Sequence, residues 1–141
     1  MGRIIGIDVG QKRIGLAVTD PLGIFATPLD TVPVSAVFSY LRDYSEKVKI
    51  DAFVVGAPLM LNNMPSESVK FTEPFVKKLI KTFPGIPVKR IDERFTSVIA
   101  KKAMLEGGMR KMERRNKAMI DMVSAAIMLQ SFLDQEKTLN R

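Results

Sequence analysis

Three acidic residues stand in apolar surroundings, where an acid is costly and therefore informative. Asp8 lies in an apolar first segment, and Asp121 is the only acid within the apolar stretch 118–133. Glu93, with its neighbour Asp92 as a rival, ends a third apolar segment. Burying an unpaired carboxylate is unfavourable by several kcal/mol, so three such acids together indicate a divalent cation that neutralises them.

The chemistry of such a centre follows from the residue types that the chain lacks. The chain has no His and no Cys, so carboxylates must carry any acid, base or metal chemistry. Oxygen ligands favour Mg²⁺ or Mn²⁺ over Zn²⁺. Two such ions roughly 3.5 to 4 Å apart can activate water and stabilise the leaving oxygen of a phosphodiester. Without metal the carboxylates would repel one another, so Asp121→Asn is expected to raise the melting temperature of the metal-free protein.

Each acid also has a structural alternative. A neighbouring basic residue would form an ion pair with Asp8 or Glu93, and the dipole of a helix that begins late would stabilise Asp121. The basic residues in question are Lys12 and Arg13 for Asp8, and Arg90 and Arg94 for Glu93. Asp20, which precedes Pro21, is typical of a turn.

The basic residues favour an anionic partner. The chain holds 22 Lys and Arg against 15 Asp and Glu, a formal charge of +7, which favours nucleic acid. Residues 109–117 include five basic residues and one acidic residue, a net +4, and predict a basic loop. Basic side chains that flank the acidic centre are predicted to bind backbone phosphates. These are Lys12, Arg13, Arg94, Arg110, Lys111, Arg114, Arg115 and Lys117.

Asp8 is positioned by a predicted hairpin over residues 3–19, whose two faces differ. Alternation places large apolar side chains on one face and small residues together with Asp8 on the other. The large ones are Ile5, Ile7, Val9, Ile14, Leu16 and Val18, and the other face holds Ile4, Gly6, Asp8, Gly15 and Ala17. A face of small residues lets a helix pack unusually close, so its covering helix can approach the Asp8 carboxylate.

The remaining segments predict an α/β fold in the order βββαβαβα, with a mixed five-stranded sheet and helices on both faces. The length of 141 residues suits one domain. After the hairpin, the expected strands are an edge strand at 24–32, a buried parallel strand at 51–56 and a strand at 86–92. The expected helices are 35–47 capped by Ser35, 66–83 with a kink or late start at Pro74, 97–106 capped by Thr96, and a buried helix at 118–133. Residues 59–64 are expected to form a loop and residues 134–141 a frayed tail.

The N-terminus has no apolar signal region, and no segment approaches the ~18 apolar residues that a membrane span needs. We therefore expect a cytoplasmic protein without a membrane partner. The absence of Cys excludes disulfides and thiol nucleophiles, which is compatible with that location.

Four motifs occur in order along the chain and together cover nearly all of it. They are GIDVGQKRIGLAVTD at 6–20, VVGAP at 54–58, DERFTS at 92–97 and DMVSAA at 121–126. This set resembles the YqgF family, also called RuvX, of RNase H-like nucleases and proposed Holliday junction resolvases. The resemblance implies an RNase H-like fold and an acidic triad of Asp8, Glu93 and Asp121, which favours Glu93 over Asp92.

The resemblance also implies a function, namely maturation of the 5′ end of pre-16S ribosomal RNA, with resolution of four-way DNA junctions as the alternative. A resolvase that cuts two strands symmetrically would need a homodimer, whereas a processing nuclease could act as a monomer. The chain departs from the family pattern at Asn62-Asn63-Met64-Pro65, where glycines are usual.

Two other classes compete with a nuclease. A phosphotransferase of the actin and sugar-kinase type also begins with a Gly-Ile-Asp-x-Gly pattern, but it resembles two duplicated domains and this length suits one. A non-catalytic RNA-binding factor in ribosome assembly would gain from losing the three carboxylates, which this chain keeps. ATP binding would favour the first class, and metal-dependent cleavage would exclude the second.

Overall fold

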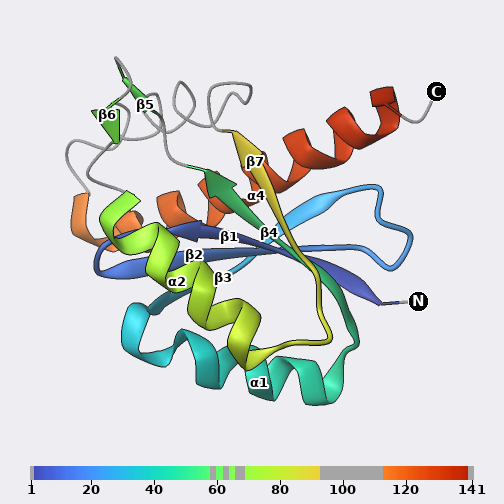
Figure 1. Cartoon of the computed structure of the whole chain (residues 1–141), viewed down its shortest axis with the longest axis horizontal. Coiled ribbons are helices and arrows are strands. Elements are labelled where there is room, and N and C mark those ends of the chain that lie inside the picture. Colours follow the sequence, from blue (N-terminus) through green and yellow to red (C-terminus); the bar gives the residue numbers. More distant parts are fainter. Residues whose placement is uncertain (1, 58–59, 62–63, 66–68, 93–112, 140–141) are drawn as a thin grey trace.

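The centre of the protein is a mixed five-stranded sheet (Figure 1). The computed structural model describes residues 2–57, 60–61, 64–65, 69–92 and 113–139. The sheet order is β3-β2-β1-β4-β7, and its strands are β1 (Arg3–Val9), β2 (Arg13–Thr19), β3 (Ala26–Pro33), β4 (Ile50–Ala57) and β7 (Val88–Asp92). The β1-β2-β3 meander is antiparallel, while β1, β4 and β7 run parallel. The predicted mixed sheet, with the third strand at its edge, is confirmed.

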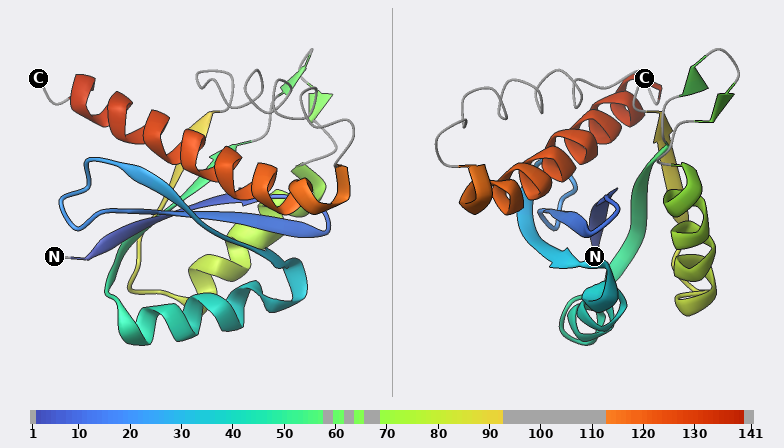
Figure 2. Two further views of the ribbon diagram at one scale, coloured as in Figure 1. Left: turned by 180° about the vertical axis from the view of Figure 1, so that it is seen from behind. Right: turned by 90° about the vertical axis from the view of Figure 1, so that its left-hand side faces the viewer.

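Helices cover both faces of the sheet, as predicted. Helices α1 (Val37–Lys47) and α2 (Val69–Thr82) lie on one side, and the long helix α4 (Glu113–Leu139) crosses the other side (Figure 2). Among the described helices, none combines the length and the apolar character needed to cross a membrane.

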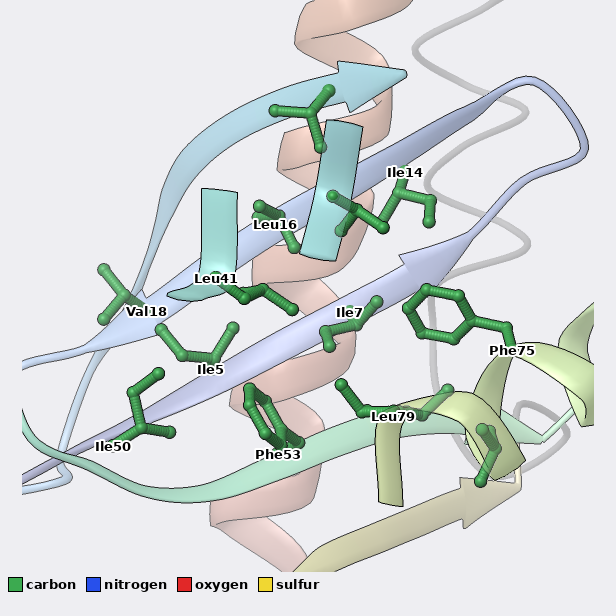
Figure 3. Close-up of a cluster of buried hydrophobic side chains, with 14 residues drawn as sticks. Ile5, Ile7, Ile14, Leu16, Val18, Leu41, Ile50, Phe53, Phe75 and Leu79 are labelled. Carbon is green, nitrogen blue, oxygen red and sulfur yellow. The ribbon is translucent and has the colours of Figure 1, made fainter. Parts of the chain in front are cut away.

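The face toward α1 and α2 is built from large apolar side chains (Figure 3). Five of the six hairpin residues predicted for this face belong to its core cluster, most of them fully buried, and the sixth, Val9, is partly buried and packs against it. They meet Leu41 of α1 and Phe75 and Leu79 of α2. The alternation read from the sequence is therefore confirmed on this face.

Two predictions about connecting segments are wrong. Ser35 does not cap a helix, because a 3₁₀ turn η1 (Val34–Ala36) comes first and Ala36 is the N-cap of α1, without a side-chain bond. The Val34 N–H donates to the Lys12 carbonyl at 3.1 Å, which ties this turn to the hairpin. The predicted loop at 59–64 contains residues of two short paired strands, β5 (Met60–Leu61) and β6 (Met64–Pro65).

Helix boundaries differ from the prediction at both ends of α4. The helix begins at Glu113, so Arg114, Arg115 and Lys117 are helical and the predicted loop over 109–117 is wrong for them. Glu, Arg, Lys and Ala are good helix formers, so a turn that contains them can be helical without an apolar period. At the other end α4 continues through Leu139, beyond the expected end at 133. Helix α2 begins late, at Val69, with Pro74 inside it.

Candidate active site

The site begins where α4 crosses the hairpin at Gly15. A Cβ atom at Gly15 would overlap the backbone carbonyl of Asp121. Further along, a Cβ at Gly6 would lie 2.8 Å from the Leu129 Cβ. The face of small residues therefore lets α4 approach the strands more closely than any side chain would allow, as the sequence predicts.

Asp8 is placed at the same point by strand pairing. In the β1–β2 register Asp8 is the partner of Gly15. Since Gly6 faces α4 and side chains alternate along a strand, Asp8, two residues on, points to the same face. Asp8 and Asp121 are 113 residues apart in the chain, yet both lie next to Gly15.

Hydrogen bonds to the edge strand β3 fix the direction in which α4 crosses the sheet. The Thr31 hydroxyl donates to the Ala118 carbonyl, and Thr31 is the β3 partner of Gly15. Three turns later the Gln130 Oε1 accepts from the Ala26 N–H at 2.8 Å, and its Nε2 donates to the Ile24 carbonyl at 3.2 Å. Held at Ala118 and Gln130, the helix keeps Asp121 over the strand next to Asp8.

Asp121 has a basic partner in the same hairpin. The Arg13 Nε donates to the Asp121 Oδ2 at 2.8 Å. The Asp121 side chain is only 15% exposed, whereas that of Arg13 is 43% exposed. Arg13, Gly15 and Ala17 alternate along β2, so Arg13 shares the face that α4 covers. From the sequence, Arg13 was an alternative ion-pair partner of Asp8, and its pairing with Asp121 was missed.

Arg90, one of the basic residues considered as a partner of Glu93, binds a carboxylate of helix α2. Arg90 on β7 binds Glu73 of α2 through two N–H···O bonds of 3.1 and 2.9 Å, and its guanidinium also donates to the Val55 and Gly56 carbonyls. The hydrogen bonds from Arg90 hold the pKa of Glu73 below its ordinary value. Arg90 thus has an acidic partner other than Glu93.

Asp20 is a turn residue, as the sequence indicates. Its Oδ1 accepts from the backbone N–H groups of Ile24 and Phe25 at 2.7 and 2.9 Å. The hydrogen bond from Phe25 is the largest cause that lowers the pKa of Asp20. Asp20 therefore shapes the β2–β3 connection and takes no part in the acidic centre.

Several predicted site residues lie outside the described residues. These are Glu93, Arg94, Arg110 and Lys111, together with the predicted helix at 97–106 and its cap Thr96. Within the described ranges, no group of three or more acidic side chains could hold a metal ion. Asp92, the last residue of β7, directly precedes Glu93. Lys12 and Lys117 are exposed, and Arg114 and Arg115 belong to the first turn of α4.

The comparison with protein families decides the class of the chain. The family described as "RuvX: Holliday junction resolvase" matches residues 2–135. The chain belongs to the RuvX family. The predictions of this family and of a nuclease are thereby confirmed.

RuvX relatives of similar length support the assignment. A protein of Parabacteroides distasonis is 51% identical over 137 residues, which cover 97% of this chain and 98% of the relative. A protein of Porphyromonas gingivalis is 51% identical over 134 residues, which cover 95% and 97% of the two chains. Both carry the provisional name of a pre-16S rRNA nuclease.

Solved structures confirm the RNase H-like fold expected for a RuvX protein. Thermus thermophilus RuvC in complex with a Holliday junction substrate matches with a TM-score of 0.60 and 16% identity, covering 97% of this chain and 96% of that one. Another Thermus thermophilus RuvC structure matches with a TM-score of 0.53 at the same 16% identity, covering 96% and 97%. At this identity the similarity concerns the fold alone.

Proposed function

We propose that this RuvX chain is a metal-dependent endonuclease whose substrate is structured RNA at the 5′ end of pre-16S ribosomal RNA. The observation that carries the proposal is the close approach of α4 to Gly15, which brings Asp121 to the strand residue that pairs with Asp8. Relatives that are 51% identical over nearly their whole length carry the name of such a nuclease. We place the reaction in the cytoplasm and assign it to residues 1–141 as one domain.

The metal would be Mg²⁺ or Mn²⁺, held by Asp8, Asp121 and Glu93 in a two-ion site. The donors are carboxylate oxygens, which hard divalent cations prefer. The 2.8 Å bond from Arg13 supports the fit, since it indicates that the largely buried Asp121 carboxylate binds positive charge. When bound, such ions supply the charge that activates water and stabilises the leaving oxygen of a phosphodiester.

Basic residues around the two carboxylates would hold the substrate backbone. Lys12 and Lys117 are exposed, and Arg114 and Arg115 lie close in sequence to Asp121. Arg13, Arg94, Arg110 and Lys111 complete the proposed set. Because binding of backbone phosphates releases counterions, replacing Lys12 and Lys117 with Gln should flatten the slope of log K against log salt by about 0.7 to 0.9 for each phosphate that is no longer neutralised.

The test compares two substrates and two aspartates. The purified chain, with Mg²⁺ or Mn²⁺, is given an RNA that spans the 5′ end of 16S rRNA and a four-way DNA junction of equal length. We expect cleavage of the RNA, loss of cleavage in chelator, and loss in Asp8→Asn. Asp43→Asn, the same change at an exposed position of α1, should cleave normally.

Each other outcome selects a different function. Preferred cleavage of the junction would favour the resolvase that the family description names, acting as a homodimer. Metal-independent RNA binding without cleavage would favour an assembly factor. Cleavage by Asp8→Asn at the wild-type rate would disprove the assignment of the acidic centre.

A further inference from the structure

The ion pair between Arg13 and Asp121 joins two side chains of unequal exposure. Asp121 is held on a helix whose backbone is pressed against Gly15, and its side chain is 15% exposed. Arg13 is the first residue of β2, and its side chain is 43% exposed. Rotation of one flexible side chain is therefore enough to separate the pair, with no movement of a strand or helix.

The backbone of Arg13 is fixed independently of this pair. Its carbonyl accepts from the Gly10 N–H at 3.0 Å, and Arg13 pairs with Pro33 in the sheet. The bond to Asp121 uses Nε alone, one of five N–H donors on the guanidinium. A guanidinium matches the geometry of a phosphate as well as that of a carboxylate. The same side chain could thus bind either Asp121 or a substrate phosphate.

We propose that Arg13 is the counter-ion of Asp121 in the metal-free protein, and that binding of a divalent cation transfers its guanidinium to a phosphate of the nucleic acid. The inference rests on the proposed function. A cation bound at Asp121 would repel a guanidinium 2.8 Å from the same carboxylate. The displaced guanidinium then increases affinity for an anionic backbone, so metal and nucleic acid bind with positive cooperativity.

The first experiment measures Mn²⁺ affinity by calorimetry on the full chain without nucleic acid. Arg13→Gln should bind Mn²⁺ about fivefold tighter or more than wild type, the lower end of typical couplings between sites, because the competing cation is gone. Arg13→Lys should stay closer to wild type. Lys12→Gln removes the neighbouring positive charge without touching the ion pair, so its Mn²⁺ affinity should change much less.

The second experiment uses the wild-type chain and keeps the test valid if Arg13→Gln fails to fold. The NMR signal of the Arg13 Nε–H, assigned with Arg13→Lys, should be protected from exchange without metal and lose that protection when Mg²⁺ is added. Unchanged protection in Mg²⁺, or equal Mn²⁺ affinity in wild type and Arg13→Gln, would overturn the inference and leave the nuclease proposal intact. A wild-type chain that binds no divalent cation would overturn both.

Discussion

The two faces of the β1–β2 hairpin have different roles, since one stabilises the fold and the other positions charged residues. Toward α1 and α2 the strands present Ile5, Ile7 and Leu16, all fully buried, in a continuous apolar core. Toward α4 they present Gly6, Gly15 and Ala17, beside the charged Asp8 and Arg13. Burial of large side chains supplies stability on the first face. The second face lacks these large apolar side chains, and its small residues let α4 bring Asp121 close to Asp8.

Helix α4, which covers the second face, contains a buried polar group that shows the same difference between the two faces. The Ser124 hydroxyl, one turn after Asp121, is fully buried and is the only buried side-chain polar atom in the described part of the chain without a hydrogen-bond partner. An unsatisfied buried hydroxyl is destabilising. Close to Asp121, small and polar residues thus take positions that a core built for stability would fill with large apolar ones, and the large apolar side chains of α4, such as Leu129 and Phe132, lie further along the helix.

The largest effect on stability is expected from the apolar face. Leu16→Ala should lower the free energy of unfolding by about 2 to 5 kcal/mol, because it removes a fully buried side chain and leaves a cavity. The folded fraction should still cleave substrate at the wild-type rate, since Leu16 points away from α4. Denaturant unfolding and the specific activity of the folded protein check both parts. Leu22→Ala, at a 68% exposed position, is the control for stability.

Gly15→Ala should lower stability less than Leu16→Ala does, but it should strongly lower activity, which Leu16→Ala leaves unchanged. The added Cβ would overlap the Asp121 carbonyl, so α4 must move; overpacking of this kind lowers stability by about 1 to 3 kcal/mol. A shift of Asp121 by about 1 Å should lower activity roughly 100-fold. Gly85→Ala is the control, since a Cβ there meets no atom within 4 Å. Wild-type activity in a folded Gly15→Ala protein would contradict the role given to this close approach.

Asp121→Asn tests the charge balance of the second face. From the sequence alone, relief of repulsion is expected to raise the metal-free melting temperature. The ion pair with Arg13 reverses that expectation, because the Asn variant loses a 2.8 Å charge-assisted bond. We expect the metal-free protein to lose about 1 kcal/mol of stability, since Arg13 can turn to solvent. Thermal unfolding in chelator measures the loss, and Arg13→Gln in the same background should add little to it.

The sequence predicts those features of the fold that depend on residues close together in the chain. The period-two alternation over residues 3–19 correctly assigned both faces of the hairpin, because adjacent side chains in a strand must point apart. The first turns of α4 were missed because the residues at 113–117, ERRNK, show no apolar period. Strands β5 and β6, of two residues each, are too short to show alternation.

The ion pair of the site was missed for a different reason. Arg13 and Asp121 are 108 residues apart, and only the angle at which α4 crosses the sheet brings them together. That angle depends on Thr31 and Gln130, whose bonds to the helix and the edge strand follow from tertiary packing. One local signal was available, since Arg13 alternates with Gly15 and Ala17 and therefore shares the face of Asp8.

The smallest effect is expected at the ion pair of Glu73 and Arg90, which belongs to α2 and β7 rather than to the acidic centre. Because Arg90 lowers the pKa of Glu73 from its ordinary 4.5, the pair stabilises the fold above that value. This contribution disappears as the pH falls through the lowered pKa. Glu73→Gln should therefore lower stability at neutral pH by about 1 kcal/mol or less, as both side chains are partly exposed, and the difference should vanish in acid.

Denaturant unfolding of wild type and Glu73→Gln, from neutral pH to below the lowered pKa of Glu73, measures this loss of stability. Glu46→Gln, at an exposed position of α1, is the control. The Mn²⁺ affinity of Glu73→Gln should equal that of wild type, whereas Asp121→Asn should bind Mn²⁺ far more weakly. The contrast separates two ion pairs of similar length, 2.9 and 2.8 Å. Arg90 is also bonded to the carbonyls of β4 and stays in place, whereas Arg13 must leave its carboxylate when a divalent cation binds. Weaker Mn²⁺ binding in Glu73→Gln would show that the two pairs are coupled and that this division is wrong.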